Sequence, residues 1–207
     1  MAQILRIHPE NPQARLIARA VAVIRSGGVI VYPTDSTYAI GCQIAHPAAV
    51  AKIRKLRQLD ESHGLTLMCR DLSELSHYAV IDNSTYRLMR GLTPGPYTFL
   101  LKATREAPRR LKHAKKKHIG IRVPDHPVTR ALLEELEEPL LSTTLRLPGE
   151  EEPLNDVDEI IERVGANVDL IIDAEACGLE PTSIIELVEG VPVIVRRGCG
   201  DLAFLEN

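Results

Sequence analysis

The chain has 207 residues, of which 44% are hydrophobic and 26% are charged, the composition of a globular protein large enough to enclose a core. No apolar run approaches the roughly 20 residues of a membrane-spanning helix, and the first residues lack the charged start and apolar stretch of a secretory signal. Aromatic residues make up only 3%, which argues against a protein that stacks single-stranded bases on exposed rings. We therefore expect one cytoplasmic domain over residues 1–207, with its core at about 10–200.

The elements alternate between helical and strand patterns along the chain. In chain order, the pattern predicts a helix from Asn11-Pro12 to Gly27-Gly28, a strand at 29–32, a helix at 47–58, a strand at 65–68, a helix start at 71–74, a short helix at 86–89, strands at 97–101 and 119–123, a helix at 127–137, a strand at 139–144, an acidic loop at 149–158 leading into a helix, and strands at 170–172, 183–187 and 191–195. The last two strands are predicted to form a hairpin across Glu189-Gly190. The sequence therefore indicates a single α/β domain, a twisted open sheet of mixed direction with flanking helices.

The net charge of −3 hides a strong segregation of charge. Seven Lys or Arg residues and one acid lie between Arg105 and Lys117, whereas the stretch from Glu134 to Glu162 holds eleven acids and one base, Arg146. The basic block can hold the phosphate backbone of RNA, or it can be a solvated segment that compensates the acidic one.

The four cysteines contain no C-x-x-C pair, so we expect buried thiols and neither a disulfide framework nor a metal site. The chain also lacks the glycine-rich dinucleotide and P-loop patterns. Any bound phosphate must then be held by side chains and other backbone turns.

Several polar groups are candidates for binding. The run Thr34–Tyr38 follows a strand, where α/β proteins bind ligands, although it can equally be a polar turn. Lys55 and Arg57, with Arg54, offer cations to a polyphosphate or form a solvated helix face.

Two strands carry arginines at informative positions. Arg122 lies in an apolar strand, so it must pair with an internal carboxylate or point into a cavity that holds an anion. By the alternation of a strand, either Arg196 or Arg197 must face the interior side of the sheet. His126 is expected to be a capping or core histidine, and the hydroxyls of Ser142–Thr144 are explained equally by binding or by β-propensity.

Together these segments form a recognisable pattern from about Ile4 to Gly198. The residues that carry it are Gly27-Gly28, the run Tyr32–Gly41, the segment Pro94–Thr98, Gly120, Arg122, Pro124, His126, Pro127, the segment Pro139–Thr144, the segment Pro181–Ile185, Arg196 and Gly198. The sequence resembles the YrdC/YciO family of threonylcarbamoyl-AMP synthase-like proteins.

The resemblance implies an α/β sheet around a large, positively charged cavity. Synthases of this family combine threonine, bicarbonate and ATP, which carries Mg²⁺, into threonylcarbamoyl-AMP and pyrophosphate for modification of a tRNA adenosine. By resemblance, Thr34 and Tyr38 line the amino-acid pocket, Arg122 faces the threonine carboxylate, Thr182 and Ser183 help to hold it, and Arg196 contacts the nucleotide phosphates. The expected substrate-binding set is Thr34, Tyr38, Lys55, Arg57, Arg122, Ser142, Thr144, Thr182, Ser183 and Arg196.

The sequence departs from the synthase signatures K-x-R and S-x-N. Without gaps, Arg57 and Leu59 occupy the Lys and Arg positions, while a shift by two would place Lys55-Leu-Arg57 there; Thr144-Leu-Arg146 replaces S-x-N. These changes resemble the YciO branch and imply anion binding with a weak or altered synthase activity.

An alternative function is RNA binding, including double-stranded RNA, without synthesis. It would use the cavity and a basic segment consisting of Arg109, Arg110, Lys112, Lys115, Lys116 and Lys117. A third alternative binds small anions without turnover. The binding hypotheses require Arg57, Arg122 and Arg196 to converge on one hollow.

Overall fold

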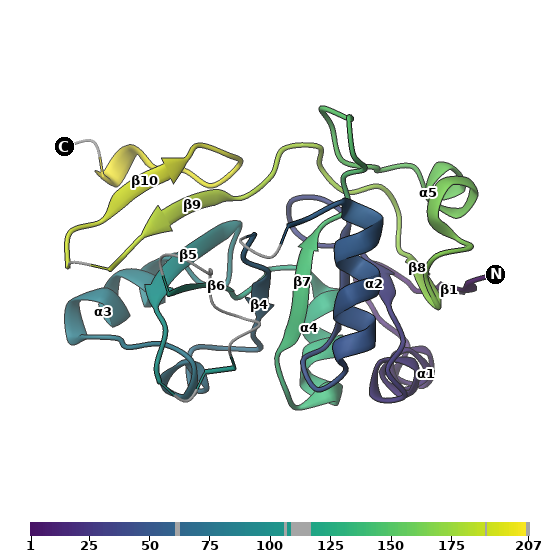
Figure 1. The fold of residues 1–207 in the computed structure, drawn as a ribbon, viewed down its shortest axis with the longest axis horizontal. Helices are drawn as coiled ribbons and strands as arrows, with labels where there is room; N and C mark the ends of the chain where they lie inside the picture. Colours follow the sequence, from purple (N-terminus) through teal and green to yellow (C-terminus); the bar gives the residue numbers. More distant parts are fainter. Residues whose placement is uncertain (61–62, 106, 109–116, 189, 206–207) are drawn as a thin grey trace.

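The computed structural model describes residues 1–60, 63–105, 107–108, 117–188 and 190–205. Within these residues, ten strands form one sheet in the order β1-β8-β2-β3-β7-β4-β6-β5-β9-β10 (Figure 1). The strands are β1 (Gln3–Arg6), β2 (Ile30–Tyr32), β3 (Ala39–Gln43), β4 (Thr66–Met68), β5 (Tyr97–Lys102), β6 (His118–Arg122), β7 (Leu140–Thr144), β8 (Leu170–Asp173), β9 (Ser183–Glu186) and β10 (Val193–Arg196).

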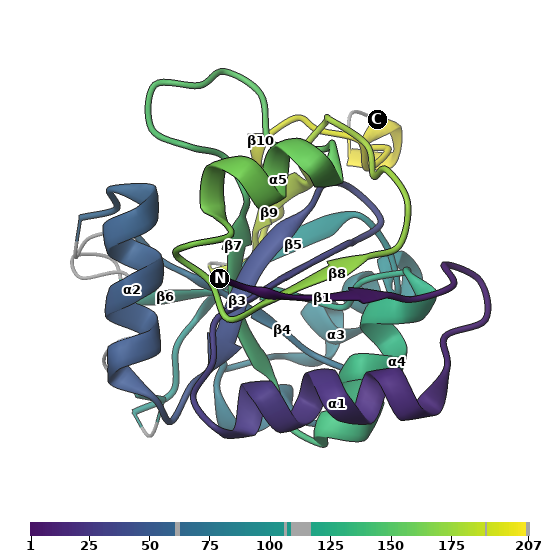
Figure 2. The same ribbon diagram turned by 90° about the vertical axis from the view of Figure 1, so that its right-hand side faces the viewer.

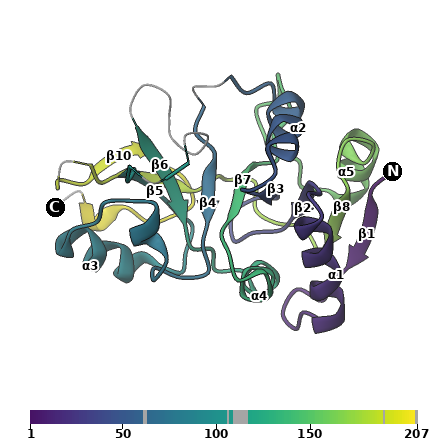
Figure 3. The ribbon, with the colours of Figure 1, turned by 60° about the horizontal axis from the view of Figure 1, so that its bottom comes forward.

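The helices lie on both sides of this sheet. They are α1 (Ala14–Arg25), α2 (Pro47–Arg57), α3 (Asn83–Leu92), α4 (Pro127–Leu136) and α5 (Val157–Val164), with short 3-10 turns η1 (Leu75–His77) and η3 (Ala203–Leu205). Figures 2 and 3 show α1 and α4 together on one face of the half that contains β1, β8, β2 and β3, and α2 and α5 on the opposite face. The two ends of the described chain lie at opposite ends of the sheet (Figure 1).

The sheet is mixed in direction, as the sequence predicts. β1 and β2 both run parallel to β8, as β4 does to β6 and β5 to β9, while β3, β7 and the β9–β10 hairpin make antiparallel pairs. The predicted single α/β sheet with flanking helices is therefore confirmed. None of the described helices has the length and apolarity needed to span a membrane.

The core consists of two buried clusters, one on each side of the sheet. Helix α1 buries Ile17, Ala20, Val21 and Ile24 at helical spacing, and these residues pack in one cluster with side chains of α4, β2 and β8. Apolar side chains of β4, β5 and β6 form part of the second cluster with residues of α2 and α5. In β6, the buried Ile119 and Ile121 alternate with His118, Gly120 and Arg122, so one face of the strand is left for other contacts.

The boundaries differ from the sequence prediction in a few places. Helix α1 begins at Ala14 with Gln13 as N-cap, rather than at Asn11-Pro12. The predicted helix start at 71–74 leads only to η1, because the Asp71 carboxylate accepts a hydrogen bond from the Ser73 amide, in a local turn. Strands β1 and β3 were not predicted.

The prediction of four buried thiols is partly wrong. Cys42 and Cys69 are buried, Cys177 is partly exposed, and Cys199 is exposed. Cys199 lies in the irregular segment that follows β10.

Candidate functional site

A cavity of about 440 Å³ opens over the middle of the sheet. Strands β3, β4, β5, β6, β7, β9 and β10 and the loop after α2 contribute its walls, and hydroxyl groups and cationic side chains predominate among its polar groups. The lining residues used below are Thr37, Thr66, Thr98, Leu100, His118, Gly120, Arg122, Ser142, Thr144, Thr182, Ile184 and Arg196. The size is appropriate for a small-molecule ligand.

The alternation of strands determines which side chains reach the cavity. Arg122, Gly120 and His118 line the cavity from one face of β6. Leu100 of β5 is paired with Gly120 and lines the cavity from the same face of the sheet. Thr144 and Ser142 reach it in the same way from β7. Residues distant in sequence are thus brought to one surface by strand register.

The run Thr34–Tyr38 forms a closed turn beside the cavity. The Thr34 hydroxyl donates to the Thr37 carbonyl at 2.6 Å and accepts from the Ser36 and Thr37 amides at 3.2 and 3.3 Å. The Tyr38 hydroxyl donates to the Glu175 carbonyl at 2.7 Å. Thr34 and Tyr38 are both buried and do not line the cavity, whereas Thr37 does. The Thr34 hydroxyl accepts a hydrogen bond from Arg122, which does line the cavity.

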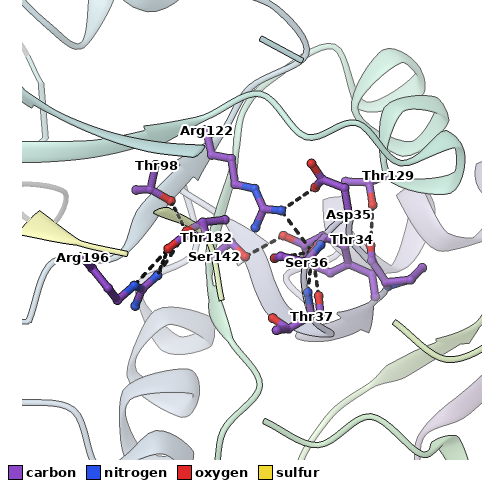
Figure 4. Close-up of polar contacts among 12 residues, drawn as sticks. Thr34, Asp35, Ser36, Thr37, Thr98, Arg122, Thr129, Ser142, Thr182 and Arg196 are labelled. Carbon is purple, nitrogen blue, oxygen red and sulfur yellow. Dashed lines mark hydrogen bonds and ion pairs between the residues drawn. The ribbon is translucent and has the colours of Figure 1, made fainter. Parts of the chain in front are cut away.

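Arg122 pairs with an internal carboxylate and also reaches the cavity. Its guanidinium donates to the Asp35 carboxylate and, at 3.3 Å, to the Thr34 hydroxyl (Figure 4). Arg122 also lines the cavity. Its Nε and the Asp35 Oδ2 are buried atoms without a hydrogen-bond partner in the described part of the chain. Arg122 is therefore anchored by a carboxylate and retains hydrogen-bonding capacity.

Arg196 lies at the same cavity on the other side of Thr182. Its Nε and Nη2 donate to the Thr182 carbonyl at 3.0 and 2.8 Å, and Nη2 reaches the Thr182 hydroxyl at 3.1 Å (Figure 4). Partial burial lowers the pKa of Arg196, and the charge of Arg146 lowers it further. Arg196 lines the cavity and Arg197 does not, although the pairing of β10 shifts register between Ile194 and Arg196.

Arg57 lies at the end of α2 but is absent from the cavity lining. Its side chain is buried, its Nε has no hydrogen-bond partner among the described residues, and burial together with the charge of Arg146 lowers its pKa to about 10. Lys55 is exposed outside the lining. Arg122 and Arg196 therefore converge on the cavity as expected, whereas Arg57 does not line it.

The remaining predicted hydroxyls divide into two groups. Ser142, Thr144 and Thr182 line the cavity. Ser183 is fully buried and donates to the Gly200 carbonyl at 2.7 Å, so it holds the chain after β10 instead of facing a ligand. The alternation of β9 explains the difference, because Thr182 and Ser183 must point to opposite faces.

Several lining residues were missed by sequence reasoning. Thr66, Thr98, Gly120 and His118 belong to the cavity face of β4, β5 and β6. Counting by two from Arg122 along its strand would have found His118 and Gly120.

The proposed nucleic-acid segment is largely outside the described residues. Arg109, Arg110, Lys112, Lys115 and Lys116 fall there, and Lys117 is exposed. Among the residues described, no group of three or more His, Cys, Asp or Glu side chains is arranged to hold a metal ion.

The chain has relatives along its whole length. The Sua5/YciO/YrdC family model, described as telomere recombination, matches residues 22–198. Escherichia coli YciO, named an uncharacterized protein, is 54% identical over 202 residues, or 98% of each chain, and its crystal structure matches with a TM-score of 0.93.

More distant similarity extends to proteins with a named activity. A threonylcarbamoyl-AMP synthase of Stenotrophomonas maltophilia is 33% identical over 177 residues, covering 83% of this chain and 93% of that protein. The crystal structure of P. abyssi Sua5 complexed with L-threonine has a TM-score of 0.86 at 24% identity and covers 95% of this chain and 58% of that one, which shows a shared fold.

Proposed function

Since the chain belongs to the Sua5/YciO/YrdC family, we propose that its cavity binds ATP and an amino acid and supports a threonylcarbamoyl-AMP synthase-type reaction that is weak or altered in substrate. The observation that carries this proposal is the pair of arginines, Arg122 and Arg196, on one cavity lined by hydroxyl groups. The similarity to a named synthase supports the reaction class.

The proposed chemistry matches what these residues offer. A carbamate oxygen attacks the α-phosphorus of ATP, a new P–O bond forms, and the bond to the β-phosphate oxygen breaks so that pyrophosphate leaves with its electron pair. Two anions must approach each other, so fixed cations aimed at the phosphoryl oxygens are the main source of catalysis, and no protein nucleophile is required.

The roles of individual residues follow from their anchoring. Arg196 is fixed through the Thr182 carbonyl and is the candidate for the phosphates. Arg122 is fixed by Asp35 and is the candidate for the amino-acid carboxylate. Mg²⁺ would arrive with the ATP, whose phosphates are its customary ligands.

The departures from the synthase signatures support a weak or altered activity. Arg146 stands where the synthases carry Asn, and its charge lowers the pKa of both Arg57 and Arg196. An additional guanidinium at this place favours bound anions, yet it replaces an amide that both donates and accepts hydrogen bonds.

The test is pyrophosphate release from ATP. Release by the purified chain is expected to require both threonine and bicarbonate and to fall at least tenfold in Arg196→Gln, as for loss of one preorganised donor. Arg197→Gln is the matched control, since this adjacent arginine does not line the cavity. Release that ignores threonine and bicarbonate, or that is equal in the two variants, would refute the proposal.

RNA binding is a second candidate, supported by the clustering of basic residues between Arg105 and Lys117. Affinity for RNA is then expected to fall steeply with added salt and to weaken when Lys115, Lys116 and Lys117 are all changed to Ala. Lys55→Ala serves as the control, because Lys55 is an exposed lysine of a different segment. Equal affinity of the triple variant and the wild type would remove the basic segment from the interface.

A further inference from the structure

Three buried polar atoms near the Arg122–Asp35 pair make no hydrogen bond within the described residues. They are the Nε of Arg122, the Oδ2 of Asp35 and the Nδ1 of His126. The side chains of Arg122 and Asp35 are only 8% and 10% exposed. Buried polar atoms of native proteins are almost always hydrogen-bonded, either to the protein or to an internal water molecule. Three such atoms in one region therefore indicate a partner that the side chains do not supply.

The fold brings the three atoms together behind the cavity wall. His126 follows Arg122 by four residues and is the N-cap of α4. The first turn of α4 is bound to the segment that carries Asp35, because the Thr129 hydroxyl donates to the Pro33 carbonyl (Figure 4). Burial lowers the pKa of His126, and the charges of Asp35 and Arg122 act on the same pKa in opposite directions, so both charges lie near the imidazole. Of these residues, only Arg122 lines the cavity.

The charges around the three atoms favour a neutral partner. The Asp35 carboxylate repels an anion, and the Arg122 guanidinium repels a cation. The Nε–H of Arg122 is a donor, the Oδ2 of Asp35 is an acceptor, and the Nδ1 of a neutral imidazole can accept. Water offers the complementary set, a lone pair and two O–H groups. Because none of the three atoms is hydrogen-bonded to another, the water molecule would have to bridge them.

We propose that Arg122, Asp35 and His126 enclose a binding site for one internal water molecule, through which His126 positions Arg122 at the cavity. The water accepts from the Nε of Arg122 and donates to the Oδ2 of Asp35 and the Nδ1 of His126. His126 is a positioning residue, because it acts through Arg122 and does not itself line the cavity. The effect on ligand binding rests on the proposed function, whereas the water site does not.

The proposal determines the tautomer of His126. With Nδ1 as an acceptor, the proton of the neutral ring lies on Nε2. The opposite tautomer would leave one buried O–H group of the water without a partner, which is costly, or would donate to Asp35 directly and make the water unnecessary. The position of this proton therefore distinguishes a bridged arrangement from a direct one.

The first experiment is NMR of the full chain at about pH 7.5, where a histidine with a lowered pKa is neutral. The ¹⁵N spectrum is expected to show an unprotonated Nδ1 in His126, and the Nε–H of Arg122 should show cross-relaxation with a long-lived water molecule. His126→Phe lacks the acceptor and should abolish this cross-relaxation, while His126→Asn offers an oxygen near the place of Nδ1 and should retain it. A protonated Nδ1, or an Arg122 Nε–H without contact to water, would overturn the proposal.

The second experiment measures the positioning of Arg122, the candidate for the amino-acid carboxylate. In threonine-dependent pyrophosphate release, His126→Phe is expected to raise the KM for threonine about fivefold, the contribution of one hydrogen bond, and to leave the KM for ATP unchanged. His126→Asn should recover most of the loss. His46→Phe is the matched control, because His46 is also a helix N-cap followed by proline and does not line the cavity. Equal increases in both KM values, or the same change in His46→Phe, would refute the positioning role.

The outcomes separate this inference from the proposed function. If release depends on threonine but the water contact is absent, the water site is refuted while the proposed function stands. If the wild type shows no threonine-dependent release, the proposed function fails and the positioning role fails with it. The NMR experiment, which needs no substrate, then decides the water site by itself.

Discussion

The guanidinium of Arg122 on β6 is hydrogen-bonded to the carboxylate of Asp35, which lies in the turn after β2, and the two side chains are only 8% and 10% exposed. The pair joins two regions separated by 87 positions in sequence. Arg122 also lines the cavity, so the proposed binding of anions would depend on the same contact that joins these two regions.

Asp35→Ala is expected to destabilise the protein by about 3–5 kcal/mol, because it leaves the Arg122 charge buried and without its partner. Urea unfolding monitored by circular dichroism measures this loss. The control is Asp125→Ala, whose carboxylate lies 3.6 Å from Arg130 with both side chains more than half exposed; its loss should be within about 1 kcal/mol. A loss of similar size in both variants would show that the buried pair contributes nothing special.

The same contact shows what a sequence can and cannot predict here. The apolar neighbours of Arg122 predict its strand and its need for a partner, but a one-dimensional pattern cannot name Asp35, whose pairing depends on the register of β4, β6 and β7. The sequence leaves a carboxylate and a cavity as alternatives because it cannot show that one side chain serves both.

The unpredicted strands have a simple physical cause. β3 consists of Ala39, Ile40, Gly41, Cys42 and Gln43, which contains one β-branched residue, so local propensity is weak and pairing with β2 and β7 determines the strand. In the turn Thr34–Tyr38, the amino-acid composition identifies hydroxyl groups but does not show which of them point into the cavity. The hydroxyls of Thr34 and Tyr38 donate to backbone carbonyl groups, whereas Thr37 lines the cavity.

Thr182→Val is expected to weaken ATP binding about fivefold, because it removes the hydroxyl that accepts from Arg196 at 3.1 Å. The carbonyl of residue 182 still anchors the guanidinium, so the loss should be partial. Calorimetric titration with ATP checks the change.

Thr98→Val is the matched control for this substitution. The Thr98 and Thr182 hydroxyls are 2.8 Å apart, so either valine removes their hydrogen bond, but only Thr182→Val removes the contact with Arg196. An equal loss of affinity in the two variants would contradict a specific role for Thr182 in positioning Arg196.

Combining Leu59→Arg with Arg146→Asn is expected to raise threonine-dependent pyrophosphate release by about tenfold, since it restores the groups found at these positions in the synthase signatures. Arg146→Asn also removes the like charge that lowers the pKa of Arg57. Leu59 packs against the core, so Leu59→Arg alone should lose stability, and thermal unfolding must accompany the assay.

The single variants and a surface control complete that experiment. Arg197→Asn removes an exposed arginine that does not line the cavity and should leave the rate unchanged. A properly folded double variant that is no faster than the wild type would show that other differences limit the activity.

His126 is expected to make the protein less stable as the pH falls below about 6.5, the ordinary histidine value in an unfolded chain. Burial lowers the pKa of His126 in the folded protein, the Asp35 carboxylate opposes that shift, the Arg122 guanidinium adds to it, and Asp125 opposes it. At pH values between the lowered pKa of His126 in the folded protein and its pKa in the unfolded chain, the unfolded chain binds more protons than the folded protein. Acidification therefore favours the unfolded chain. The stability present above pH 6.5 is therefore lost as the pH falls through the folded pKa.

His126→Gln removes this titration, and its Nδ1 has no hydrogen bond to lose among the described residues. Urea unfolding of the wild type and the variant at several pH values between about 5 and 7.5 isolates the contribution of His126 from that of the other six histidines, because these are common to both proteins. The free energy of unfolding of the wild type should decline toward pH 5 more steeply than that of His126→Gln. A difference between the two proteins that stays constant with pH, or that grows in favour of the wild type on acidification, would mean that His126 is not held neutral by its burial.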